Sequence, residues 1–182
     1  MTRSRFLLLF AALGACGAQA PAEVKKADDT FVQAFMSTCV RDFENQSRIE
    51  AAARTMSWKP ITDPDIRKML EPENGAAKWN GWIFRHQKLG MMLALSESKI
   101  DNRGVKSCVL VSELQSVQAT KTKLVELLQA KIMARDNEGG QKSEVWRFSF
   151  DGKPRILSFI DAEAMGMNTL NAGVSSDWTV TK

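Results

Sequence analysis

The spacing of apolar residues changes along the chain and predicts helices, then strands, then a helix, then strands. Over residues 27–43, apolar side chains recur every three or four positions, and Phe31, Phe35, Cys39 and Phe43 share one stripe. This period is typical of a helix with a wide buried face. We therefore expect a first helix that carries Cys39 on its buried side.

A second helix is expected over residues 48–56, because Ser47 is followed three residues later by a glutamate, as in a capping box. The next segment, residues 57–81, contains three prolines and two tryptophans, which favours an irregular connection anchored by the tryptophans. Within it, Asp63-Pro64 predicts one short helical turn. Such a segment either covers the core or forms a binding element.

After the proline-containing segment, apolar and polar residues alternate, which is the period of a strand. Strands are expected over residues 82–87, 91–96 and 105–112, with a turn or bulge at Gly90. The last of these strands contains Cys108.

Residues 120–135 have the clearest helical pattern in the chain. The side chains expected to face the core are Leu124, Leu127, Leu128 and Ile132, and those expected to face solvent are Lys121, Lys123, Glu126 and Lys131. Residues 137–140 contain two glycines and are expected to end this helix.

Two further strands, residues 143–150 and 154–161, flank the dipeptide Asp151-Gly152, a strong hairpin signal, and a weaker strand is expected over residues 174–180. This order predicts an α+β fold with N-terminal helices and an antiparallel sheet of about five to six strands. One long amphipathic helix would separate two groups of strands. Both halves run from helix to strands, which suggests an internal repeat, although no residues match between them.

The N-terminal residues have the order of a secretory signal. A basic leader at residues 1–5 precedes an apolar run at residues 6–12, which is shorter than the roughly 20 residues needed to span a bilayer. Leu13-Gly14-Ala15-Cys16 resembles a lipobox, so we predict a signal peptide over residues 1–15 and lipidation of Cys16. The alternative is ordinary cleavage after Ala20, which would discard Cys16 with the leader.

A short polar tether over residues 16–29 and a single domain over residues 30–182 are expected to follow. Gly17, after the lipobox cysteine, is compatible with sorting to the outer membrane, so we expect a periplasmic protein anchored there through its lipid. Loss of Arg3 and Arg5 with the leader lowers the formal net charge from +4 to about +2. This small net charge does not indicate binding to nucleic acid.

Two cysteines remain in the domain, and in an exported protein an isolated pair favours a disulfide. A Cys39–Cys108 bond would close a loop of about 70 residues. The alternatives are two buried free thiols or a reactive cysteine, although neither residue lies in a C-x-x-C motif.

No catalytic or cofactor motif is recognisable, so no cofactor is expected. The single histidine, His86, lies in a strand pattern on the side of Trp82 and Phe84, where we interpret it as a packing residue rather than a catalytic one. The other candidates are weaker. The methionine pairs Met91-Met92 and Met165/Met167 could bind Cu(I), and the acid pairs Asp63/Asp65 and Asp161/Glu163 are common in solvated loops.

The signal, the stretch Phe35-Met-Ser-Thr-Cys39 and the tryptophan-containing sheet together resemble small uncharacterised proteobacterial envelope lipoproteins and periplasmic proteins. This resemblance implies no particular activity.

We therefore expect a non-enzymatic cell-envelope lipoprotein that acts as a binding or structural module. Its expected partners are the membrane, through the N-terminal lipid, and another envelope protein. Two alternatives stay open: a binder or inhibitor of a periplasmic hydrolase, and a small periplasmic hydrolase that uses His86.

Overall fold

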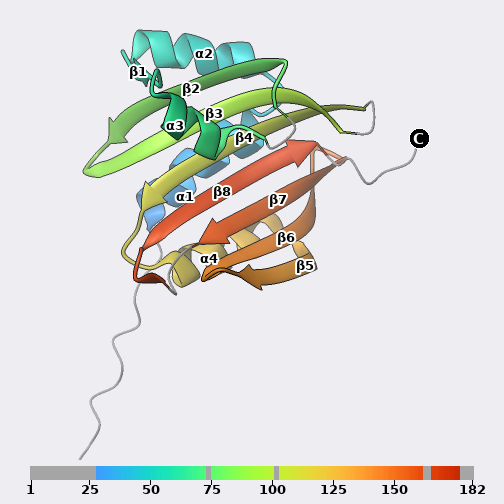
Figure 1. Cartoon of the computed structure of the whole chain (residues 1–182). Helices are drawn as coiled ribbons and strands as arrows, with labels where there is room; N and C mark the ends of the chain where they lie inside the picture. Colours follow the sequence, from blue (N-terminus) through green and yellow to red (C-terminus); the bar gives the residue numbers. More distant parts are fainter. Residues whose placement is uncertain (1–27, 73–74, 101–102, 162–164, 177–182) are drawn as a thin grey trace, which may run out of the picture.

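The structure, a computed structural model, describes residues 28–72, 75–100, 103–161 and 165–176 (Figure 1). These residues form one eight-stranded antiparallel sheet in the order β1-β2-β3-β4-β8-β7-β6-β5. The strands are β1 (Lys59–Pro60), β2 (Lys78–His86), β3 (Leu89–Ile100), β4 (Arg103–Glu113), β5 (Lys131–Glu138), β6 (Gln141–Phe150), β7 (Lys153–Asp161) and β8 (Thr169–Ser176). The helices are α1 (Asp29–Phe35), the π-helix η1 (Met36–Arg41), α2 (Gln46–Thr55), α3 (Pro64–Leu70) and α4 (Val117–Leu128).

The sheet consists of two four-stranded meanders, β1–β4 and β5–β8, which join through β4 and β8. The pairing of β4 with β8 runs from Ser107 opposite Ser175 to Glu113 opposite Thr169. Each meander is preceded by a helix that packs on the same face of the sheet, α1 for the first and α4 for the second. The two halves therefore repeat one topology.

The main core lies between this face of the sheet and the helices α1, η1 and α4. Phe31 and Phe35 of α1 are fully buried and stack on each other at 6.2 Å between ring centroids. In Figure 1, α1 and α4 lie behind the sheet and α3 lies in front of it. A smaller apolar cluster, centred on Ile61, Leu70, Ala94 and Val111, fills the space between α3 and strands β2–β4.

The predicted α+β fold class, with five to six strands and a long helix, is wrong, because the described residues are mostly sheet, with eight strands and short helices. The expected long helix over residues 120–135 is α4, which has 12 residues, ends at Leu128 and has Gln129 as its C-cap. Gln129 adopts a left-handed conformation (φ 49°, ψ 38°), and the chain then continues as β5. Since glutamine is not a residue that favours this conformation, the sequence contained no stop signal there.

The buried face of α4 also differs from the prediction. Lys121, expected in solvent, is 2 % exposed, whereas Leu127, expected in the core, is 54 % exposed. Ile132 belongs to β5 and is 44 % exposed. The helix in fact buries Val117, Thr120, Lys121, Leu124 and Leu128.

Several N-terminal boundaries are corrected as well. The first predicted helix divides into α1 and η1 at Met36. The second helix is capped by Asn45, whose side chain accepts a hydrogen bond from the Arg48 amide, rather than by Ser47. Residues 57–81, expected to be irregular, contain β1, α3 and the start of β2. The short turn at Asp63-Pro64 is confirmed as α3.

Of the predicted turns, one is confirmed and two are wrong. The Asp151-Gly152 hairpin is confirmed between β6 and β7, and both residues have positive φ angles of 50° and 73°. Gly90 lies inside β3, because the turn falls at Gln87 and residue 88. Residues 137–140 end no helix; their glycines form the tip of the β5–β6 hairpin.

The leader, Cys16, residues 16–27 of the expected tether and residues 177–180 of the expected last strand lie outside the described residues. The last strand within them, β8, covers Thr169–Ser176. No helix in the described residues is both long and apolar enough to cross a membrane.

Candidate functional site

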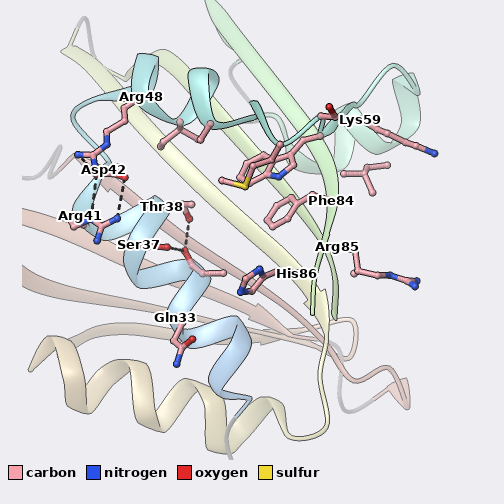
Figure 2. A pocket seen from close by; sticks show the side chains of 18 residues that line it. Gln33, Ser37, Thr38, Arg41, Asp42, Arg48, Lys59, Phe84, Arg85 and His86 are labelled. Carbon is pink, nitrogen blue, oxygen red and sulfur yellow. Dashed lines mark hydrogen bonds and ion pairs between the residues drawn. The ribbon is translucent and has the colours of Figure 1, made fainter. Parts of the chain in front are cut away.

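An open groove of about 910 Å³ lies between α1 and η1 on one side, α2 on a second side and the end of β2 on the third (Figure 2). It exists because α2 packs over the outer part of the sheet while α1 and η1 pack nearer its centre. The groove is lined by Gln33, Ala34, Ser37, Thr38, Arg41, Asp42, Arg48, Ile49, Ala52, Met56, Ser57, Trp58, Lys59, Ile83, Phe84, Arg85, His86 and Gly90.

One wall of the groove is the π-helix η1. The hydroxyls of Ser37 and Thr38 both donate to the Ala34 carbonyl, at 3.0 and 2.7 Å. Such bonds compete with the backbone of the helix, and the Asp42 amide reaches back five residues to the Ser37 carbonyl at 3.3 Å. Short π-helical segments occur frequently at functional sites.

The predicted disulfide is confirmed, and it fixes this wall to the sheet. Cys39 of η1 is bonded to Cys108 of β4, with 5.2 Å between their Cα atoms. Both residues are fully buried. Since Ser37, Thr38 and Arg41 line the groove while Cys39 is buried in the core, the bond holds the π-helix with its polar side toward the groove.

The floor of the groove is apolar. Trp58 and Phe84 stack with their ring centroids 4.1 Å apart and their planes at 11°. Ile49 lies beneath, 2 % exposed, and Met56, at the rim, is 62 % exposed. This floor offers aromatic and aliphatic surface to a ligand, and Met56 is a flexible side chain that can adapt to it.

One end of the groove carries charge. Asp42 lies 3.5 Å from the Arg41 Nε and 3.5 Å from the Arg48 Nη1, so two guanidinium groups share one carboxylate. Figure 2 shows these three side chains together at one end, while Lys59 and Arg85, which also line the groove, lie toward the other. The charged end therefore has a surplus of one positive charge.

The packing role expected for His86 is wrong. Its strand position is on the same side of β2 as Trp82 and Phe84, but its side chain is exposed and lines the groove. Within the described residues, no hydrogen bond or ion pair joins the His86 side chain to a carboxylate. Figure 2 shows it between α1 and β2, apart from Asp42.

The other candidates from the sequence are not brought together. Met91 is 1 % exposed in the core, whereas Met165 and Met167 are 45 % and 48 % exposed, with Met165 beside the β5–β6 turn. Asp63 caps α3 by accepting a hydrogen bond from the Asp65 amide at 2.8 Å. Glu163 lies outside the described residues. No group of three or more His, Cys, Asp or Glu suited to a metal ion occurs in the part of the chain that the structure describes.

A buried ionic cluster holds α4 on the second meander, and sequence reasoning missed it. The Lys121 Nζ donates to Asp161 Oδ2 at 2.8 Å and lies 3.3 Å from Glu144 Oε2. The side chains of Lys121 and Asp161 are each 2 % exposed. The only signal was position, because residue 121 lies four residues after Val117 and three before Leu124 on the buried stripe. The cluster does not line the groove.

The loop between η1 and α2 is tied to β7 by a second ion pair. The Arg155 Nη2 donates to Glu44 Oε1 at 2.6 Å, and its guanidinium carbon lies 4.5 Å from the centre of the Phe43 ring. Partial burial favours a higher pKa for Glu44, but the hydrogen bond and charge of Arg155, with the charges of Lys153 and Lys106, outweigh it. The pKa of Glu44 is therefore lowered from its ordinary value of 4.5.

Comparisons with known proteins add no identification. No protein-family model, curated protein or solved structure matches this chain. The functional argument therefore depends on the sequence and on the geometry of the groove.

Proposed function

We propose that this protein is a non-enzymatic binding module of the bacterial cell envelope, and that the groove between α1, η1, α2 and β2 is its binding site. The leader and the lipobox ending at Cys16 support export and attachment to the outer membrane through a lipid. The groove supports binding, because its volume lies in the range of roughly 300–1,000 Å³ that is typical of ligand sites.

The observation that carries the proposal is the composition of the groove. An apolar floor, a wall held in place by a buried disulfide and a charged end occur together in one concave surface. Ligand sites commonly combine an apolar lining with a few placed polar groups that orient the ligand. A purely structural module has no need of such a surface.

A hydrolase that uses His86 is less well supported. A catalytic histidine base is commonly oriented by a third group, often a carboxylate, within hydrogen-bond reach of the imidazole. Asp42, the carboxylate that lines the groove, instead pairs with Arg41 and Arg48. His86 therefore contributes a polar rim in this proposal rather than a catalytic group.

The binding role is tested by filling the groove. Ala52→Phe places a ring in the groove, whereas Ala51→Phe, at the neighbouring exposed position of α2, is the matched control. The full-length chain, extracted from bacterial envelopes, is examined by native mass spectrometry for molecules that remain bound. We expect a bound species with the wild type, Ala51→Phe and His86→Gln, and none with Ala52→Phe.

Two results would overturn this role. One is bound material that Ala52→Phe leaves unchanged, since the groove would then not be the site. The other is chemical conversion of the bound molecule by the wild type that a stably folded His86→Gln variant loses while it still binds the molecule, because this points to catalysis.

The proposed anchor is tested by mass spectrometry of the mature N-terminus. We expect a lipid-modified Cys16 as the first residue. A free N-terminus at Pro21 would contradict the anchor and would leave the groove argument intact.

A further inference from the structure

We propose that the ligand of the groove is a free fatty acid, with its carboxylate at Arg41 and Arg48 and its chain along Trp58 and Phe84. This inference rests on the proposed binding role and names the class of ligand. It is argued from the arrangement of charge and apolar surface along the groove.

The groove has two arginines that share one carboxylate at one end, and the stacked rings of Trp58 and Phe84 on its floor. Lys59, Arg85 and His86 also line it, away from that end. Arg41, Asp42 and Arg48 lie at one end, and Phe84 lies toward the other (Figure 2).

The charged end favours a monoanion. Two guanidinium groups share the single carboxylate of Asp42, and both contacts are 3.5 Å, longer than a strong charge-assisted hydrogen bond of about 2.7–2.9 Å. The side chains of Arg41 and Arg48 are 61 % and 66 % exposed, so their donors remain accessible. A planar carboxylate matches the fork of donors that a guanidinium presents, and one such group neutralises the surplus charge.

An extended peptide fits the groove less well. A bound peptide needs partners for its backbone amides and carbonyls. The Ser37 and Thr38 hydroxyls use their protons on the Ala34 carbonyl, so they can only accept from a ligand. On the opposite side, β1 covers the edge of β2 at Trp82 and Ile83. An acyl chain has no backbone groups to satisfy and gains from the same apolar floor.

The experiment measures binding to the full-length chain by isothermal titration calorimetry, with octanoate, decanoate and dodecanoate kept below their micelle concentrations. We expect the affinity to rise by up to about fourfold for each methylene buried, at about 0.8 kcal/mol each. Dodecan-1-ol, which lacks the carboxylate, should bind roughly tenfold more weakly than dodecanoate.

Variants at the charged end should change the affinity in opposite directions. Arg41→Gln combined with Arg48→Gln should lower dodecanoate affinity by about tenfold or more. Asp42→Asn, which removes the competing carboxylate, should raise it severalfold. Arg54→Gln is the matched control, because Arg54 is an exposed residue of α2 that does not line the groove. Thermal denaturation of each variant establishes that it is folded.

The outcomes separate this inference from the proposed function. Binding of dodecanoate that responds to the charged end and is lost in Ala52→Phe supports both. Failure of every fatty acid, while an acidic peptide or a lysophospholipid binds and Ala52→Phe abolishes that binding, overturns the ligand class alone. Dodecanoate binding that neither Ala52→Phe nor the arginine variants change overturns the assignment to this groove.

Discussion

The two meanders of the sheet share a strand order but differ in how their helices are held. In the first meander, η1 is joined to β4 by the Cys39–Cys108 disulfide. In the second, α4 is held by the buried pair of Lys121 with Asp161. The first meander also has helices on both faces, with α1 and α2 on one and α3 on the other, whereas β5 is exposed along its whole length (Figure 1).

This difference explains why the groove belongs to the first meander. A covalent bond leaves the rest of the π-helix free to present polar residues to solvent, since its position does not depend on them. In the second meander, the contacts that fix α4 are themselves the polar groups, and they are buried. Charged groups therefore fix the packing of the helix in the second meander, whereas in the first meander they remain available to a ligand.

The largest loss of stability is expected when the Cys39–Cys108 disulfide of the first meander is removed. Replacing both Cys39 and Cys108 with alanine should lower the free energy of unfolding by about 4 kcal/mol, because the bond closes a loop of about 70 residues. Equilibrium denaturation in urea measures this loss. Hydrogen exchange should rise in η1 more than in α4, and equal increases in both would show that the bond does not act locally.

A somewhat smaller loss of stability is expected when the buried ion pair of the second meander loses its cation. Lys121→Met leaves Asp161 buried without its cation and should cost about 3 kcal/mol in the free energy of unfolding. Lys123→Met is the control on the same helix. It removes an exposed pair with Asp29 and should cost no more than about 1 kcal/mol. If the two variants lose equal stability, the buried cluster does not hold α4.

The smallest loss of stability is expected for the ion pair between Glu44 and Arg155, which links the two meanders. The pKa of Glu44 is lowered in the folded protein, so its stabilising contribution is fully present above its ordinary pKa of 4.5. The contribution is lost as the pH falls through the lower folded-state pKa. Because Glu44 is 47 % exposed, the contribution should be below about 1 kcal/mol.

The measurement compares urea midpoints of the wild type and Glu44→Gln between about pH 6 and pH 3. The wild type should be the more stable at the upper end, and the difference should shrink on acidification. A difference that stays constant over this interval would contradict a role for the Glu44 charge.

Some of this architecture was readable from the sequence, because it depends on local chemistry. Asp151-Gly152 favours the positive φ angles of a tight hairpin, and Asp63-Pro64 supplies a cap and a first helical residue. The disulfide was readable from the number of cysteines together with the predicted export of the chain. Each of these features needs only neighbouring residues or a residue count.

The remaining features depend on contacts between distant segments. Gln129 ends α4 without a glycine, and Lys121 is buried only because Asp161, 40 residues away, lies opposite it. The groove forms where α2, the π-helix η1 and β2 come together. No local sequence pattern predicts that α2 packs at a distance from η1. The strand count was underestimated because β5 has the apolar spacing of a helix and because β1 has only two residues, inside the proline-containing segment.

The most direct test of this account is hydrogen–deuterium exchange of the full-length chain with and without dodecanoate. We predict slower exchange in the groove segments of the first meander, residues 33–41, 48–59 and 83–90, and no change in α4 or in β5–β8. Protection confined to the second meander, or equal protection in the wild type and in Ala52→Phe, would contradict the claim that the groove is the binding site.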